Sequence, residues 1–135
     1  KQKVPPARVE VKGDTTEVEL STIPEQLKYN LTEFKVKAGS KVKLTFHNAE
    51  VIPHNFLIVQ PGAKAEVGNQ AITMGQAALK QAPKNDKILI GTRMLELRQS
   101  ETLNFTAPAN PGNYEFLCTF PGHWQVMSGI MQVLK

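Results

Sequence analysis

The sequence predicts an all-β fold, a Greek-key β-sandwich or flattened barrel of seven or eight strands with one short inserted helix. Most of the chain alternates apolar and polar residues with period two, the pattern of half-buried strands. Turn-forming residues separate the alternating segments, at Pro24, Pro61-Gly62, Pro108 and Pro111-Gly112. A chain of 135 residues without repeats favours one domain spanning residues 1–135.

The first elements follow a polar start. Residues 1–7 contain Pro5-Pro6, and paired prolines favour a stiff, extended segment. We interpret these residues either as a linker stub or as a frayed terminus. Two strands are predicted next, over 9–12 and 16–21, and their inward side chains are Val9, Val11, Val18 and Leu20.

The stretch 33–48 predicts two strands around a Gly39-Ser40 turn. Its apolar residues alternate with lysines, so the lysines form the solvent-facing side: Lys35, Lys37, Lys41 and Lys43. The following run, HNFLIV at 54–59, is largely apolar and suits a buried strand.

The exception to strand patterning lies at 69–82. Ala71, Met74, Ala78 and Leu79 recur at helical spacing there, and Pro83 ends the pattern. We expect a short helix packed on the outside of the sheets, with Met74 as a core residue.

Strand patterns resume at 87–97, 101–107, 112–118 and 129–134. In the third of these, Tyr114, Phe116 and Cys118 share one face. Met131 lies on the inward face of the last strand and is expected to be core, and Met94 has no ligand spacing to any other residue.

Composition excludes several classes of function. The net charge of +4 is modest and the lysines are scattered, so no basic cluster with interleaved aromatics indicates a nucleic-acid partner. No apolar run is long enough to span a membrane, and no signal peptide is visible. A single cysteine cannot form an internal disulfide.

That cysteine opens the stretch CTFPGHWQVM, which runs from Cys118 to Met127. His123 lies on the turn between two strand ends, so a thiol, an imidazole and a thioether converge at one pole of the sandwich. Zinc sites seldom use thioether, whereas thiolate, thioether and imidazole together favour copper. Cysteine with two histidines and an axial methionine is the ligand set of blue-copper electron-transfer sites.

Two histidines are candidates for the remaining ligand. His47 shares a face with the lysines of its strand and is expected at the surface. His54 opens an apolar strand and shares a face with Phe56 and Ile58, so it points inward. A lone inward histidine is more often a hydrogen-bonded core residue, but the convergent loop favours His54 as a ligand.

The motifs C-x4-H-x3-M and PHNF at 53–56 resemble those of the type 1 copper proteins, the cupredoxins, and within them most closely the auracyanins. The resemblance implies that His54, Cys118 and His123 bind one copper ion with Met127 axial. Azurins have a glycine before the first histidine and carry a disulfide. Here the position is Pro53 and there is one cysteine, so four ligands are expected rather than five.

Residues around the site are also expected to have roles. The Asn55 amide is expected to bond Thr119 and tie the two ligand segments together. An apolar collar around the exposed edge of His123 is expected to serve as the electron-transfer surface; its members are Pro53, Phe120, Pro121, Trp124 and Val126.

By the same resemblance, the protein is expected to be a monomeric extracytoplasmic electron carrier of the periplasmic side and not an enzyme. Its redox partners would be a quinol-oxidising membrane complex and a photosynthetic reaction centre, a cytochrome c or another respiratory acceptor. A tether absent from this chain would hold it at the membrane. The alternatives are a copper storage or delivery protein, a thiol enzyme using Cys118, and a domain of a larger oxidase or nitrite reductase.

Overall fold

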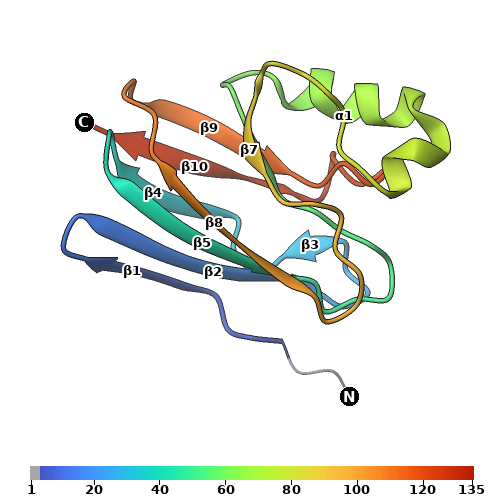
Figure 1. Ribbon diagram of the computed structural model, residues 1–135, viewed down its shortest axis with the longest axis horizontal. Helices are drawn as coiled ribbons and strands as arrows, with labels where there is room; N and C mark the ends of the chain where they lie inside the picture. The colour runs from blue at the N-terminus through green and yellow to red at the C-terminus, as the bar shows by residue number, and fades with distance from the viewer. Residues whose placement is uncertain (1–3) are drawn as a thin grey trace.

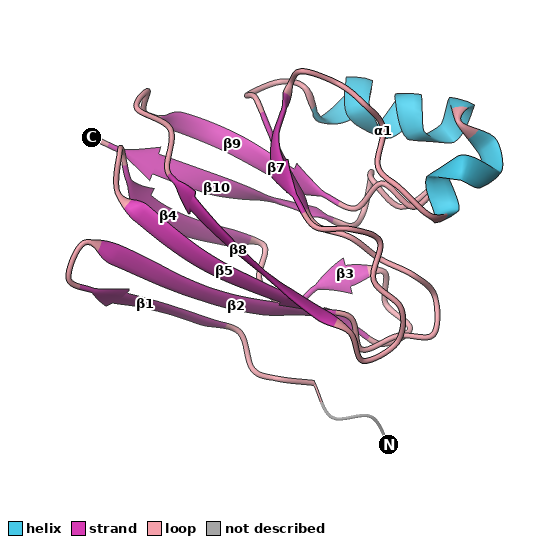
Figure 2. Cartoon of the chain, in the orientation of Figure 1, coloured by secondary structure: helices cyan, strands magenta, loops and turns pink. Residues whose placement is uncertain are grey.

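Two five-stranded sheets pack face to face in the computed structural model, which describes residues 4–135 (Figures 1 and 2). The predicted all-β sandwich is confirmed. The interpretation of residues 1–7 concerns in part residues 1–3, which lie outside the described residues. Within the described chain the strands are β1 (Arg8–Lys12), β2 (Thr15–Ile23), β3 (Lys28–Tyr29), β4 (Glu33–Lys37), β5 (Lys41–His47), β6 (Leu57–Val59), β7 (Ile88–Gly91), β8 (Ser100–Thr106), β9 (Gly112–Leu117) and β10 (Ser128–Leu134).

The strand order is β1-β2-β5-β8 in one sheet, with β3 paired to β2, and β4-β10-β9-β6-β7 in the other. Both sheets are mixed, because β2 runs parallel to β5 and β4 runs parallel to β10. The described residues form ten strands, against the seven or eight predicted; one of the additional strands is β3, whose two residues are too few to show a pattern.

Aromatic side chains fill the space between the sheets. Tyr29 from β3 packs edge-on against three phenylalanine rings, with centroid separations of 5.5 to 5.7 Å. These rings are Phe46, Phe56 and Phe116. The same core includes Cys118, Met127 and Met131, so the pole that carries the sulfur side chains is continuous with the core.

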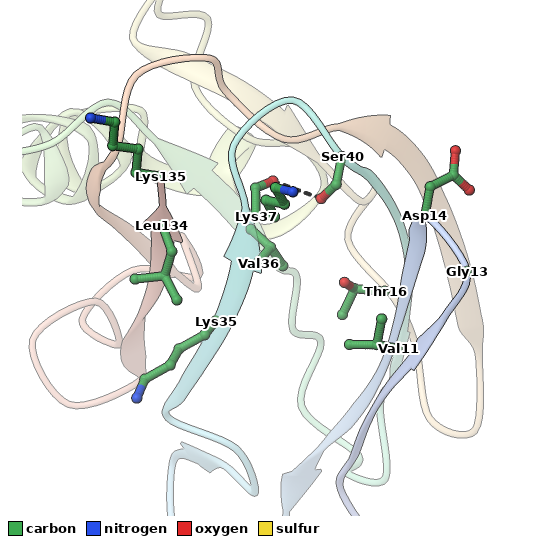
Figure 3. Close-up of a pocket in the computed structure, with 10 residues that line it drawn as sticks. All are labelled: Val11, Gly13, Asp14, Thr16, Lys35, Val36, Lys37, Ser40, Leu134 and Lys135. Atoms are coloured by element: carbon green, nitrogen blue, oxygen red, sulfur yellow. Dashed lines mark hydrogen bonds between the residues drawn. The ribbon is translucent and has the colours of Figure 1, made fainter.

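The first strand departs from prediction. Val9 and Val11 are 43 % and 70 % exposed, although Val9 pairs with buried Val18 across the sheet. Strand β1 lies at the sheet edge, where little of the second sheet covers it (Figure 1). Beside this edge, at the end of the sandwich away from Cys118, a groove runs between the sheets, lined in part by Val11, Val36 and Leu134 (Figure 3).

The helical segment also differs from prediction. Helix α1 (Lys64–Thr73) begins five residues before the predicted start, and a 3-10 turn, η1 (Gly75–Leu79), follows it. Gly75, with φ of 63°, ends α1 well before Pro83, because glycine readily adopts the left-handed conformation that terminates helices. Met74 is only half-buried and Leu79 is 38 % exposed, so their predicted place in a buried helix face is wrong.

Helix α1 covers the outer face of the second sheet beside β9 (Figure 2). Val67 packs there against Leu57 and Leu117 in a small second core, to which Trp124 also contributes. Helix α1 therefore braces the loop that follows β9.

Among the described residues, no helix is both long and apolar enough to cross a membrane.

Candidate metal centre

Three buried side chains bring metal-binding atoms together at one pole of the sandwich. The Cys118 sulfur lies 3.7 Å from Nδ1 of His54 and 3.9 Å from Nδ1 of His123. All three ligand atoms lie within 4.8 Å of one another. His54 and Cys118 are fully buried and His123 is 7 % exposed.

These separations fit a single metal ion. Bonds of about 2.0 Å to nitrogen and about 2.3 Å to sulfur, the lengths that zinc takes, place nitrogen and sulfur about 3.7 Å apart when they meet at about 120°. The two observed sulfur–nitrogen distances are 3.7 and 3.9 Å. One thiolate and two imidazoles in a trigonal arrangement are the equatorial set of a blue-copper site.

The loop after β9 is folded by its own backbone. Cys118 N donates to Met127 O, and Met127 N donates to His123 O at 2.8 Å. His123 N in turn donates to Phe120 O. These bonds place Met127 opposite Cys118, where its side chain is fully buried in the same core cluster.

His54 is held by a different part of the chain. Its backbone N–H and C=O pair with Leu95 in an isolated bridge, with N···O distances of 3.1 and 2.8 Å. The next carbonyl, of Asn55, accepts a bond of 2.7 Å from the buried Tyr29 hydroxyl. The predicted strand 54–59 is regular only from Leu57, because the Phe56 N–H donates to the Thr92 hydroxyl and not to the backbone of a neighbouring strand.

Asn55 joins the two ligand segments. Its amide nitrogen donates to Thr119 Oγ1, and its amide oxygen accepts the Thr119 N–H, each at 2.8 Å. Both residues are buried. The sequence predicted this contact, and it fixes the neighbour of His54 to the neighbour of Cys118.

Glu50 was not among the predicted site residues. Its Oε1 lies 2.7 Å from Nε2 of His54, and its side chain is nearly buried. The signal in the sequence is an acidic residue four positions before the histidine, within a mostly apolar stretch. That signal is weak alone, because the contact depends on the path of the 48–53 loop.

Burial decides the protonation states in the absence of a metal ion. It raises the pKa of the Cys118 thiol to about 12. It lowers the pKa of His123 to about 4, with a smaller contribution from His54, and it lowers the pKa of His54 as well. The imidazoles are therefore neutral with free lone pairs at neutral pH, and a cation is needed to stabilise the thiolate.

Two members of the predicted collar contact His123 directly, since Phe120 packs on its ring and the Val126 N–H donates to its carbonyl. Pro53, Phe120, Pro121 and Trp124 are half-buried, and Val126 is 56 % exposed. Phe120 stacks on His123 with ring centroids 4.5 Å apart. Trp124 packs against Gly68 of α1, so its indole braces the loop as well as lining the surface.

The remaining candidate residues lie elsewhere. His47 is half-buried on β5, where Nδ1 lies 2.7 Å from the Ser100 hydroxyl, and it is outside the ligand cluster. Met131 is buried in the core, as predicted, and Met94, for which the sequence predicted only the lack of a ligand spacing, is buried as well.

Comparison with known proteins gives a consistent result. Residues 16–134 match the family model of the copper-binding proteins, plastocyanin/azurin family. The chain is 31 % identical to auracyanin-A of Chloroflexus aurantiacus over 119 residues, which cover 86 % of this chain and 73 % of that protein. It is 32 % identical to auracyanin-B of the same organism over 121 residues, 86 % of this chain but only 51 % of that longer protein.

A solved structure resembles the fold closely. Dithionite-reduced auracyanin from the photosynthetic bacterium Roseiflexus castenholzii superposes with a TM-score of 0.79 at 37 % identity, covering 91 % of this chain and 98 % of the other. The residues of the candidate centre lie within residues 16–134, the part of the chain that matches the family model.

Proposed function

Because the chain belongs to the plastocyanin/azurin family of copper-binding proteins, we propose that it is a one-electron carrier whose copper ion is held by His54, Cys118, His123 and Met127. The observation that carries the proposal is the cluster of three buried ligand atoms within 4.8 Å. When bound, the copper ion supplies a one-electron Cu(I)/Cu(II) couple.

The protein's own contribution is rigidity and exclusion of water. Two sheet-anchored segments carry the ligands, and the paired Asn55–Thr119 bonds hold the segments together. Little movement is available to the ligands when the charge at the site changes, which favours fast electron transfer. The buried Met127 thioether offers a weak axial ligand, and the apolar surroundings help to set the potential.

The alternatives fit the geometry less well. A nucleophilic cysteine needs a lowered pKa, whereas burial raises the pKa of Cys118 to about 12. A storage or delivery site favours exposed, exchangeable ligands, whereas His54 and Cys118 are fully buried. A catalytic oxidase or nitrite reductase domain needs further histidines, and His47 is the only other one in the chain.

The carrier works outside the cytoplasm, on the periplasmic side, held at the membrane by a tether beyond this chain. It moves electrons from a quinol-oxidising complex to a photosynthetic reaction centre, a cytochrome c or another acceptor. Similarity to auracyanins of photosynthetic bacteria supports this assignment. Small apolar surfaces suit brief redox encounters, and exposed Val126 beside His123 offers one.

The first experiment adds Cu(II) to the copper-free protein and records the visible and EPR spectra. We expect an intense blue band and a narrow hyperfine splitting. Both should be lost in Cys118→Ser and kept in His47→Gln, a control that removes the histidine outside the cluster. A pale, ordinary cupric spectrum in the unmodified protein would contradict the proposed centre.

A second experiment tests the docking surface. Val126→Asp places a charge beside His123, and Val11→Asp makes the same change on the exposed edge strand β1. We expect only the first to slow electron transfer to a purified cytochrome c, measured by stopped flow. Equal rates for the two variants would contradict a docking role for this surface.

A further inference from the structure

Glu50 occupies a buried place behind the candidate copper centre. It lies in the loop between β5 and β6 and is 7 % exposed. One carboxylate oxygen lies 2.7 Å from Nε2 of His54, and the other accepts the backbone N–H of Glu25. A buried carboxylate is retained only where such donors replace the lost water.

The geometry assigns the tautomer of His54. Nδ1 faces the Cys118 sulfur at 3.7 Å, so this nitrogen carries the lone pair that a metal would take. The proton therefore resides on Nε2, which donates to Glu50 Oε1. Both carboxylate oxygens accept hydrogen bonds, as the ionised form requires.

The loop that carries Glu50 is held by hydrogen bonds of the Asn48 side chain. Asn48, fully buried, donates through its amide nitrogen to the carbonyls of Ile52 and Leu95. Its amide oxygen accepts the N–H of Glu50 itself, at 3.0 Å. The Glu50 backbone is therefore fixed by Asn48, and its carboxylate is fixed by the Glu25 N–H, so its side chain is oriented toward His54.

The turn between β2 and β3, which donates to the second oxygen of Glu50, has a strained backbone. Glu25 and Leu27 have φ of 68° and 51°, a left-handed conformation that costs free energy for residues other than glycine. Such strain persists where the surrounding structure enforces it, and it clusters at functional sites. Here the turn presents the Glu25 N–H to the second oxygen of Glu50.

We propose that Glu50 is a positioning residue that holds His54 with Nδ1 toward the copper ion and that its buried negative charge lowers the reduction potential of the centre. The proposal rests on the copper function proposed above. A negative charge favours Cu(II) over Cu(I), because the oxidised ion carries more positive charge. A carboxylate on the far imidazole nitrogen also makes the ligating nitrogen a stronger donor.

Two variants separate charge from position. Glu50→Gln removes the charge and one of the two acceptor oxygens but retains one oxygen that can accept the Nε2 proton of His54, whereas Glu50→Ala removes the charge and both oxygens. The matched control is Glu101→Gln on β8, since Glu101 also accepts a backbone N–H, that of Arg93, but lies outside the ligand cluster.

The first readout is the reduction potential of the copper-loaded protein. We expect Glu50→Gln to lower the ratio of Cu(II) to Cu(I) affinity about tenfold, which raises the potential by about 59 mV for a one-electron couple. Because the charge is buried, the shift should persist at high salt. A potential equal to that of Glu101→Gln would overturn the electrostatic part of the proposal.

The second readout uses copper-free protein and is independent of the copper function. Nitrogen NMR of His54 should show one tautomer, with the proton on Nε2, in the unmodified protein and in Glu101→Gln. Glu50→Ala should show a mixture of tautomers. A single unchanged tautomer in Glu50→Ala would overturn the positioning role. Absence of the blue band in the unmodified protein would refute the copper function, and this tautomer result would still decide the positioning role.

Discussion

Gly68 in helix α1 provides a quantitative test of how the helix braces the ligand loop. A Cβ atom at this position would lie 2.1 Å from Cγ of Trp124 and 2.4 and 2.5 Å from the next two ring atoms. Carbon atoms pack at about 3.5 Å or more, so the indole would have to retreat by about 1.4 Å. Trp124 directly follows the proposed ligand His123, so we expect the displacement to reach the candidate centre.

The expected sign of Gly68→Ala follows from two opposing terms. Overpacking costs about 1–3 kcal/mol, and the better helix propensity of alanine returns up to about 1 kcal/mol. The overlap of about 1.4 Å puts the cost in the upper part of the overpacking range, so we expect a net loss of about 1–2 kcal/mol in the free energy of unfolding. For a chain of this size that lowers the melting temperature by about 3–7 °C.

The assay is thermal unfolding of the copper-free protein, followed by circular dichroism, with a matched background. In Trp124→Ala the obstructing ring is gone, so adding Gly68→Ala should then stabilise the protein by up to about 1 kcal/mol. This reversal of sign isolates the contact between the two residues. If Gly68→Ala alone melted at or above the unmodified protein, the argument would be refuted.

Three further predictions concern single side chains. Asn55→Ala leaves the buried Thr119 N–H and hydroxyl without their partner, so it should cost about 2–4 kcal/mol in denaturant unfolding and speed copper loss; unchanged stability, copper retention and potential would contradict the tie. Met127→Leu nearly conserves volume in a fully buried position, so stability should fall by less than about 1.5 kcal/mol while voltammetry shows a changed potential; an unmoved potential would argue against an axial role. Met74→Gln should change the free energy of unfolding by no more than about 0.5 kcal/mol in the same assay, because Met74 is only half-buried. A loss above about 2 kcal/mol would show instead that Met74 is a core residue.

Much of the fold and the ligand cluster could be predicted because the determining signals are local. The alternation of Lys35 and Lys37 with buried Phe34 and Val36 describes β4 correctly. Cys118, His123 and Met127 lie in one short stretch of sequence, so their residue types and spacing together indicated a metal site. The sequence distinguished His54 from His47 as the candidate ligand, because alternation placed His54 on an inward apolar face and His47 on a solvent-facing one.

Other features depend on what packs against an element. Val9 and Val11 alternate like core residues, yet the second sheet leaves them exposed. Helix α1 starts after Ala63, which makes no side-chain capping bond, so its beginning has no capping signal. Tyr29 joins the core from a two-residue strand, too short for any period to show.

Glu50 shows the same limit at the centre itself. Its contact with His54 requires the 48–53 loop to be folded by Asn48, and its second oxygen needs an N–H from residue 25. Neither requirement can be recognised from one short stretch of sequence. The four proposed ligands, in contrast, lie in two short stretches. The ligands therefore indicate which metal is bound, while groups brought in from distant segments adjust its potential. On the proposed role of Glu50, two proteins with identical ligands would differ in potential whenever the loop before the first histidine places a different group behind it.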